Sequence, residues 1–255
     1  MSTIFVASRS GDPKRGAWFP IGRLSFDCGI YRFAYTRGAQ KATGFYPFTG
    51  MENFTRIYQS SELFPVFANR LLAPSRPEYE AYLRWSGFDP DRPPDPIALL
   101  GVTEGIRRTD WIEVFPCPVP DGDGRFRQRF FLHGLRHMGE PARSRLARLE
   151  PGEELLPMLD PANPADAAAI ALRTQSGDRL MLGYIPRYLA RDIGTVLREC
   201  LPGHFKFVVQ QVNPDAPMQQ RLLCRLEACW PEEFQPCSGD EFQPIPAAEP
   251  ALCAA

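Results

Sequence analysis

The sequence predicts an α+β protein made of two regions. A small α+β domain comes first, and a mostly β domain follows, in which six short strands and one helix form a small barrel or tightly curved sheet. Three observations predict this. The 255 residues are 44% hydrophobic and 23% charged, as in a folded chain long enough for one large or two modest domains. Proline, glycine and aspartate crowd into residues 116–125 and break the chain there. The pattern of apolar residues changes across this break.

The first region, residues 1–116, alternates short strands with helices. Aromatic and β-branched residues between turn residues predict strands at 3–10, 18–26 and 30–36. Capping residues before helically spaced apolar residues predict helices at 60–72 and 77–88. A proline-rich connector follows at 90–96, and the residues just before 116 predict one more strand.

The second region follows a linker at residues 117–128 and spans residues 129–229. Short apolar runs predict its six strands at 129–136, 154–160, 168–174, 179–186, 205–212 and 221–229. One amphipathic helix is expected at 187–200, between the fourth strand and the fifth. Six strands with one helix in about a hundred residues are typical of a small barrel. Residues 230–255 are acidic and proline-rich, which predicts a tail that is extended along the surface or disordered.

Composition limits where and how the protein acts. No apolar run approaches the ~20 residues of a membrane span, and no signal-peptide pattern opens the sequence, so we expect a cytoplasmic protein. Seven cysteines are an odd, scattered set, which favours reduced thiols. The net charge of −1 means that any nucleic-acid surface must be a local cluster of basic residues.

The motifs of common catalytic sites do not occur. The sequence has no GxSxG, no GxxxxGK[ST] and no GxGxxG, so no enzymatic activity and no cofactor are expected. His133 and His137 stand four apart in a segment that alternates like a strand, which would separate them by about 13 Å, too far for one metal ion. Cys224, Cys229 and Cys237 lack the spacing of a zinc site.

Arginine dominates the basic residues. Lysine occurs only at positions 14, 41 and 206, so 26 of the 29 basic residues are arginine, the side chain that pairs bidentately with phosphate. The densest group is ARSRLAR at 142–148, which makes Arg143 and Arg145 candidates for phosphate contacts. Two alternatives stay open: a solvated arginine-rich helix or loop, and an arginine excess that reflects genomic base composition.

Four markers in order make residues 129–229 resemble a HIRAN domain. They are Gly134-Leu135-Arg136, the turn Leu149-Glu150-Pro151-Gly152, the NPxD signature Asn163-Pro164-Ala165-Asp166, and Gly183-Tyr184-Ile185-Pro186-Arg187. The resemblance implies a compact six-stranded, OB-like module of the kind that is fused to helicases and nucleases of DNA repair, or stands alone in bacteria.

The resemblance also implies a binding site for DNA. In the helicase-like transcription factor family the domain captures the 3′ end of single-stranded DNA. Asp166 would accept a hydrogen bond from the terminal hydroxyl, Arg136 would lie at the rim of the pocket, and Arg187 would contact a phosphate. Asn163 belongs to the same signature, although both NPxD side chains also have an ordinary reading as turn residues that bind backbone groups.

Two positions depart from members that bind DNA ends. Ala165 stands where an aromatic residue often precedes the aspartate, and His137-Met138 stands where those members carry tyrosines. Because stacking on an aromatic side chain contributes ~1 to 3 kcal/mol per base, this change weakens the expected grip on single strands. His137 and Tyr184 remain as candidates for stacking.

Residues 1–115 resemble the small N-terminal subdomain of HipA-type toxin kinases. The likeness lies in the "IGRL" and "FAY" strands, the "FANRL" segment and the "YLRWSGF" helix, while the kinase's catalytic segments are absent. Two functions are therefore expected. The first is a non-catalytic protein that binds single-stranded DNA ends or damaged DNA. The alternative is an antitoxin-like regulatory partner of a HipA-type serine/threonine kinase, docking through residues 1–116.

Overall fold

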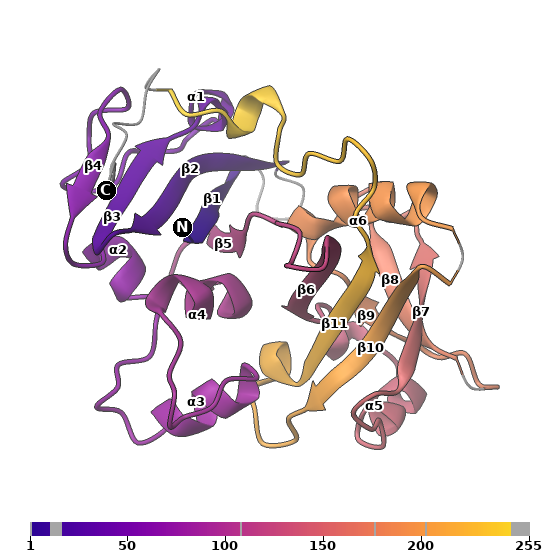
Figure 1. The fold of residues 1–255 in the computed structure, drawn as a ribbon. Helices are drawn as coiled ribbons and strands as arrows, with labels where there is room; N and C mark the ends of the chain where they lie inside the picture. The colour runs from indigo at the N-terminus through magenta and orange to yellow at the C-terminus, as the bar shows by residue number, and fades with distance from the viewer. Residues whose placement is uncertain (1, 11–16, 108, 176, 202, 246–255) are drawn as a thin grey trace. The chain divides into compact units, whose positions relative to one another are not determined.

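The computed structural model describes residues 2–10, 17–107, 109–175, 177–201 and 203–245. They form two compact units (Figure 1). The first unit contains the described residues up to Arg76, the segment Pro94–Cys117, and the described residues from Cys237 onward. The second contains Pro77–Pro93 and Pro118–Pro236. The boundary after Cys117 falls in the predicted linker, but the second unit also takes in residues 77–93, which the sequence had grouped with the first region.

The first unit is built on an antiparallel sheet of five strands in the order β4-β3-β2-β1-β5. The strands are β1 (Ser2–Ser10), β2 (Ala17–Asp27), β3 (Ile30–Tyr35), β4 (Tyr58–Ser60) and β5 (Ile112–Pro116). Its helices are α1 (Arg37–Lys41), α2 (Pro65–Ala68), α4 (Pro96–Thr103) and the 3₁₀ turn η3 (Asp240–Phe242). Three strands predicted from aromatic and β-branched residues are confirmed, as is the strand before residue 116.

Aromatic side chains fill the core of the first unit. Phe33, Tyr35 and Phe67 are fully buried, and their rings meet at edge-on or tilted angles, as aromatic pairs prefer. The Tyr35 hydroxyl donates to the carbonyl of Met51 (2.8 Å) and accepts from the amide of Phe48 (2.7 Å). Both bonds end on the irregular segment between α1 and β4, so this segment is fixed to the core without a strand or helix of its own.

The second unit is built on an antiparallel sheet of six strands in the order β6-β11-β10-β7-β8-β9. The strands are β6 (Arg125–Phe131), β7 (Glu154–Leu159), β8 (Ile170–Thr174), β9 (Met181–Tyr184), β10 (Phe205–Val212) and β11 (Leu222–Cys229). The two edge strands meet beyond β6, where His133 and Tyr184 exchange backbone hydrogen bonds of 2.8 and 2.9 Å. The sheet therefore curls until its edges touch, which confirms the predicted barrel-like domain.

Helices cover parts of this curled sheet. They are α3 (Tyr79–Trp85), α5 (Glu140–Leu146), α6 (Arg187–Glu199) and the 3₁₀ turns η1 (Leu135–His137) and η2 (Met218–Gln220). The predicted amphipathic helix is α6, whose Leu189, Ile193 and Val196 are buried in the core of the unit. Helix α3 is held by side chains of β10 and the turn after it, because Gln211 and Asn213 donate to carbonyls of Arg84 and Trp85 (both 2.9 Å).

Local chemistry explains where the elements differ from the prediction. The helix expected at 60–72 is only α2, because Ser60 ends β4 and Pro65 begins the helical turn. The strand expected at 129–136 stops at Phe131, and Gly134 has a φ of 78°, which turns the chain into η1. His133 and His137 therefore do not share one strand, contrary to the expectation.

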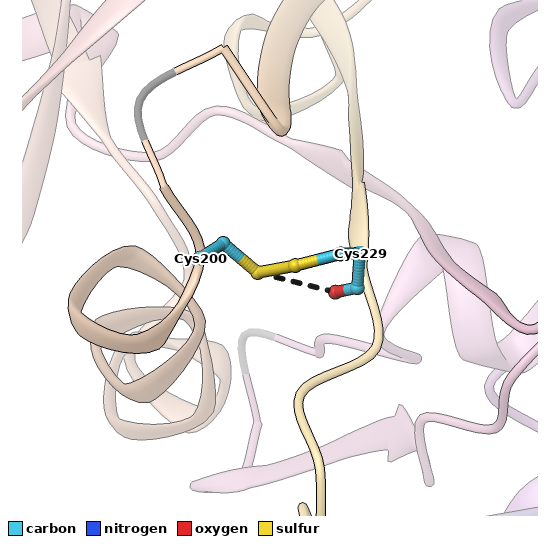
Figure 2. Close-up of a disulfide and its surroundings, with 2 residues drawn as sticks. All are labelled: Cys200 and Cys229. Carbon is cyan, nitrogen blue, oxygen red and sulfur yellow. Dashed lines mark hydrogen bonds between the residues drawn. A yellow bond between two sulfur atoms is a disulfide. The ribbon is translucent and has the colours of Figure 1, made fainter.

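Cysteines 200 and 229 form a disulfide bond with an S–S distance of 2.01 Å (Figure 2). Cys200 follows the last turn of α6 and Cys229 ends β11, so the bond ties helix to sheet across a sequence separation of 29. The expectation of reduced thiols is wrong for this pair. No spacing of the cysteines predicts this pair, since only the fold brings the end of α6 to the end of β11.

The chain after Cys237 returns to the first unit as far as the structure describes it. The Ile245 amide donates to the Tyr35 carbonyl (2.8 Å), and the Arg37 amide donates to the Gln243 carbonyl (2.9 Å). Phe242 packs edge-on against Phe5. Residues 237–245 are thus a packed part of that unit, and residues 246–255 of the predicted tail lie outside the described residues. Among the described helices, none is long and apolar enough to cross a membrane.

Candidate nucleic-acid interface

Asn163 organises the turn between β7 and β8 through both ends of its side-chain amide. Its Nδ2 donates to a carboxylate oxygen of Asp160 (3.1 Å), and its Oδ1 accepts from the backbone amides of Ala165 (3.0 Å) and Asp166 (3.3 Å). The Asn163 amide donates to the Asp160 carbonyl (3.1 Å). This is an Asx-type turn, in which the side chain replaces missing backbone partners. It fixes the direction in which Asp166 leaves the turn.

Asp166 is held by the turn and by the first residue of α6. Its Oδ1 accepts from the Ala168 amide (3.0 Å), and its Oδ2 accepts from Nε of Arg187 (3.1 Å). Arg187 also donates from Nη2 to the Ala165 carbonyl, which ties both sides of the turn to the helix. The side chains of Asp166 and Arg187 are 23% and 32% exposed. The carboxylate is therefore fixed in place and still reachable from solvent.

Tyr184, at the end of β9, joins this turn to the closure of the barrel. Its hydroxyl donates to the same Asp160 oxygen that Asn163 contacts (2.9 Å). Burial, together with the neighbouring Asp160 carboxylate, raises the pKa of the Tyr184 hydroxyl, which stays protonated as a donor. A side chain added at Gly134 would come within 3.4 Å of the Tyr184 ring, so the ring lies against the αL turn before η1.

Arg136 and His137 lie on η1 next to this network. Nε of Arg136 donates to Nε2 of His137 (3.0 Å), and both side chains are exposed. η1 contacts β9, which ends at Tyr184. The structure therefore gathers Arg136, His137, Asn163, Asp166, Tyr184 and Arg187 at one edge of the barrel, and we call these six residues, with Asp160, the edge cluster.

The two arginines of the ARSRLAR segment differ in their surroundings. Arg143 is exposed, pairs with Glu140 (2.9 Å) and donates to the Met138 carbonyl (3.0 Å), one residue after η1. Arg145 is mostly buried at 15% exposure and pairs with Glu153, before β7. Arg143 thus borders the edge cluster, whereas the guanidinium of Arg145 is engaged elsewhere within the fold.

A pocket of about 210 Å³ lies outside the edge cluster, on β10 and β11. Its lining includes Lys206 and Arg225, but both cations already have carboxylate partners, Glu154 (2.7 Å) and Glu227 (2.8 Å). The other lining residues are Gly152, Val208, Val209, Gln210 and Glu227. The pocket and the NPxD signature therefore lie at different places in the second unit. The edge cluster, unlike the pocket, joins the side chains of the signature in one hydrogen-bond network.

Asp160 is the member of the edge cluster that the sequence did not single out as a site residue. It receives the hydroxyl of Tyr184 and the amide of Asn163 on one oxygen. The signal was its position three residues before Asn163, which suits a β-turn closed by the Asn163 amide and the Asp160 carbonyl. That spacing does not reveal Tyr184 as a partner, because Tyr184 arrives from another strand.

The sequence profile of the HIRAN domain matches residues 126–227, which lie within the second unit and include all four markers. The match leaves out residues 1–125. A search of curated proteins with the whole sequence finds no match.

Two solved structures are similar to part of the chain. A crystal structure of a protein from Lactobacillus plantarum is 22% identical, with 41% of this chain and 97% of that chain covered and a TM-score of 0.31. The crystal structure of the HIRAN domain of human HLTF is 17% identical, with 47% and 86% covered and a TM-score of 0.32. The profile match identifies residues 126–227 as a HIRAN domain, which is a nucleic-acid-binding module.

Proposed function

We propose that the HIRAN domain of this protein binds the free 3′ ends of single-stranded DNA, or the ends exposed in damaged DNA, at the edge cluster. The observation that carries this proposal is the position of Asp166. Its carboxylate is partly exposed and is fixed by Ala168 and Arg187. A carboxylate held in this way accepts a hydrogen bond without losing further conformational freedom.

Asp166 has the capacity to receive a terminal hydroxyl. Its two oxygens offer about four acceptor sites, of which the Ala168 amide and Arg187 occupy two. A 3′-hydroxyl donates to such a site, whereas a 3′-phosphate brings negative charge against the carboxylate. The site therefore distinguishes the two ends by both hydrogen bonding and charge.

Three arginines supply positive charge around Asp166. Arg187 uses Nε and Nη2 within the turn, and a guanidinium has five donors, so others are left for a phosphate. Arg136 and Arg143 are exposed on η1 and α5. We expect each phosphate contact to change the slope of log K against log salt by about 0.7 for a single strand. His137 and Tyr184 provide surfaces for the terminal bases.

Titration with three oligonucleotides tests the proposal: a single strand with a 3′-hydroxyl, the same strand with a 3′-phosphate, and a blunt duplex. The wild type should prefer the 3′-hydroxyl strand. Asp166→Asn keeps the shape of the side chain and the oxygen that accepts from the Ala168 amide, but it removes the negative charge. It should reduce the preference for the 3′-hydroxyl strand about tenfold, as for the loss of one charge-assisted hydrogen bond. Asp215→Ala, an exposed carboxylate of the same unit, is the control. Equal, negligible binding of all three at low salt would sink the proposal.

The protein is proposed to act without catalysis. The edge cluster holds one carboxylate paired with arginine and another bound by a tyrosine and an asparagine, which suits binding rather than proton transfer. Turnover of ATP by the purified protein, absent from an Arg187→Met variant and present in wild type, would overturn this part.

A second candidate function uses the first unit as a docking module for a HipA-type kinase. This unit has an aromatic core of its own and exposes Tyr46 and Trp111, side chains common at protein interfaces. We expect a kinase gene beside the gene of this protein. We also expect the kinase to co-purify with this protein when residues 1–116 are intact. Without either, this candidate is abandoned. The cytoplasmic location stays a prediction from the sequence.

A further inference from the structure

The outer face of β7, β8 and β9 leads directly to the edge cluster. Cross-strand pairing puts Leu156 opposite Arg173, and Arg173 opposite Met181. In the next row, Met158 is opposite Ala171, which is opposite Tyr184. Alternation along β7 and β8 turns their side chains in these rows away from the core, where Leu155, Ile170 and Leu172 point. In β9 a register shift opposite Leu172 and Arg173 brings both Tyr184 and Met181 into these rows. We call Leu156, Met158, Ala171, Arg173, Met181 and Tyr184 the outer face.

Tyr184 is both the end of this face and part of the edge cluster. Its hydroxyl reaches Asp160, which follows β7, so the side chain extends from β9 across β8. Ala171, on β8 between them, is completely buried. A residue as small as alanine leaves room for the ring to cross β8. The two rows of the face are therefore continuous with the site proposed for the strand end.

Arg173 lies on this face, and no ion pair joins it to a carboxylate of the described residues. Its Nε is buried, and among the described residues it has no hydrogen-bond partner. Glu154, on the same side of β7, is engaged by Lys206 at 2.7 Å. The neighbours of Arg173 in its row are the apolar Leu156 and Met181. A half-buried guanidinium among apolar side chains is costly unless an anion or an aromatic ring covers it.

Met158 adds exposed apolar surface beside Tyr184. It is 37% exposed, although it lies within a strand, and its thioether is a soft surface for aromatic rings. A positive charge between methionines, next to a tyrosine ring, matches what a single strand offers, which is alternating phosphates and flat bases. A protein partner would need more apolar area than these few side chains give.

We propose that the outer face binds the nucleotides that precede the 3′ end, with Arg173 contacting the backbone and Met158 and Met181 contacting bases. This rests on the proposed function, because the strand must be oriented by the end held at Asp166. It extends the site beyond the edge cluster by a track across three strands. The domain then binds longer strands more tightly than the shortest 3′ ends.

A length series tests the track. Binding of thymidine oligonucleotides of three and eight nucleotides, both with a 3′-hydroxyl, is measured by fluorescence anisotropy. The wild type should bind the eight-mer more tightly. Arg173→Met and Met158→Ser should each reduce that ratio about fivefold, the low end of the range for one nucleotide contact of this kind. Arg198→Met, which removes an exposed arginine from the last turn of α6, is the matched control and should keep the ratio.

Further measurements distinguish a variant that fails to fold, a failure of the track and a failure of the proposed function. Arg173→Met should retain the melting temperature, because the buried Nε loses no partner. Suppose that Arg173→Met and Met158→Ser show the same eight-mer to three-mer ratio as the wild type, and that the protein still prefers a three-mer with a 3′-hydroxyl over one with a 3′-phosphate. That result would overturn the track alone. If the wild type shows no preference for the 3′-hydroxyl, the proposed function itself is overturned.

Discussion

Tyr35 and Tyr184 each end a strand, one in each unit, and each uses its hydroxyl to hold an irregular segment. Tyr35 is completely buried, and among the described residues its hydroxyl binds two backbone groups, the amide of Phe48 and the carbonyl of Met51. Tyr184 is partly exposed and binds a side-chain carboxylate, Asp160, that is shared with Asn163. Burial raises the pKa of both hydroxyls, that of Tyr35 to about 12.

The difference separates a structural network from one that is open to a ligand. Backbone partners deep in an aromatic core can be reached by nothing else, so the bonds of Tyr35 serve stability alone. In the edge cluster, Asp160, Asp166 and Arg187 lie near the surface. They keep acceptors and donors that no bond within the network uses, and the network fixes the directions of these groups. The edge cluster is thus ordered by the same kind of hydrogen bonding but remains available to a binding partner.

Removing the disulfide gives the largest expected difference between the units. Cys200→Ser with Cys229→Ser should lower the free energy of unfolding of the second unit by about 2 to 4 kcal/mol, since the bond closes a loop of some thirty residues. The first unit should keep its stability. Hydrogen exchange measured on peptides from each unit checks this, and equal loss of protection in both would contradict it.

Removing each hydroxyl tests the comparison directly. Tyr35→Phe leaves the Phe48 amide and the Met51 carbonyl without their partner, which should cost about 1 to 3 kcal/mol of stability in the first unit. Tyr184→Phe should cost less than about 1 kcal/mol, because water can replace the lost bond. Chemical denaturation measures both. For DNA affinity we expect the opposite ranking: Tyr35→Phe should bind DNA as tightly as the wild type, and Tyr184→Phe should bind it more weakly. Weaker binding by Tyr35→Phe with unchanged binding by Tyr184→Phe would contradict the distinction between the two networks.

The two arginines of α5 allow the same separation within one helix. Arg145→Ala should lower stability by about 1 to 2 kcal/mol, because it leaves the mostly buried Glu153 unpaired. Arg143→Ala removes an exposed pair worth less than about 1 kcal/mol and should leave the melting temperature nearly unchanged. In DNA titrations Arg143→Ala should reduce the salt slope by about 0.7 and Arg145→Ala should not. Identical slopes for both variants would remove α5 from the interface.

Much of the second unit could be predicted from its sequence. Apolar runs located five strands closely, and the spacing of Leu189, Ile193 and Val196 located α6, because one buried face imposes a period on the sequence. The turn chemistry of Asn163 was also readable, since an Asx turn depends on residues two or three apart.

Contacts between distant segments could not be predicted. The pairings of Tyr184 with Asp160 and of Cys200 with Cys229 arise only when strands and helix have come together, and no local pattern encodes them. The engagement of Arg145 by Glu153 is similar: its neighbours in sequence suggest an exposed cation, and packing makes it a buried one. The sequence left residues 237–245 either extended along the surface or disordered, because their anchors, Tyr35 and Arg37, lie two hundred residues earlier.

That anchor should weaken in acid, which is the smallest effect expected. Hydrogen bonds from Arg37 and then Lys41 lower the pKa of the exposed Asp240 carboxyl below its ordinary value of 3.8. A carboxyl whose pKa is lower in the folded state stabilises that state above pH ~4, and the contribution disappears as the pH falls through the folded pKa. Pepsin cleavage at Phe242 checks this. Asp240→Asn should be cut faster than wild type at pH 5, and the ratio of the two rates should approach one as the pH falls through the folded pKa of Asp240. A ratio that is constant with pH would show that the backbone bonds to Tyr35 and Arg37 alone hold the segment.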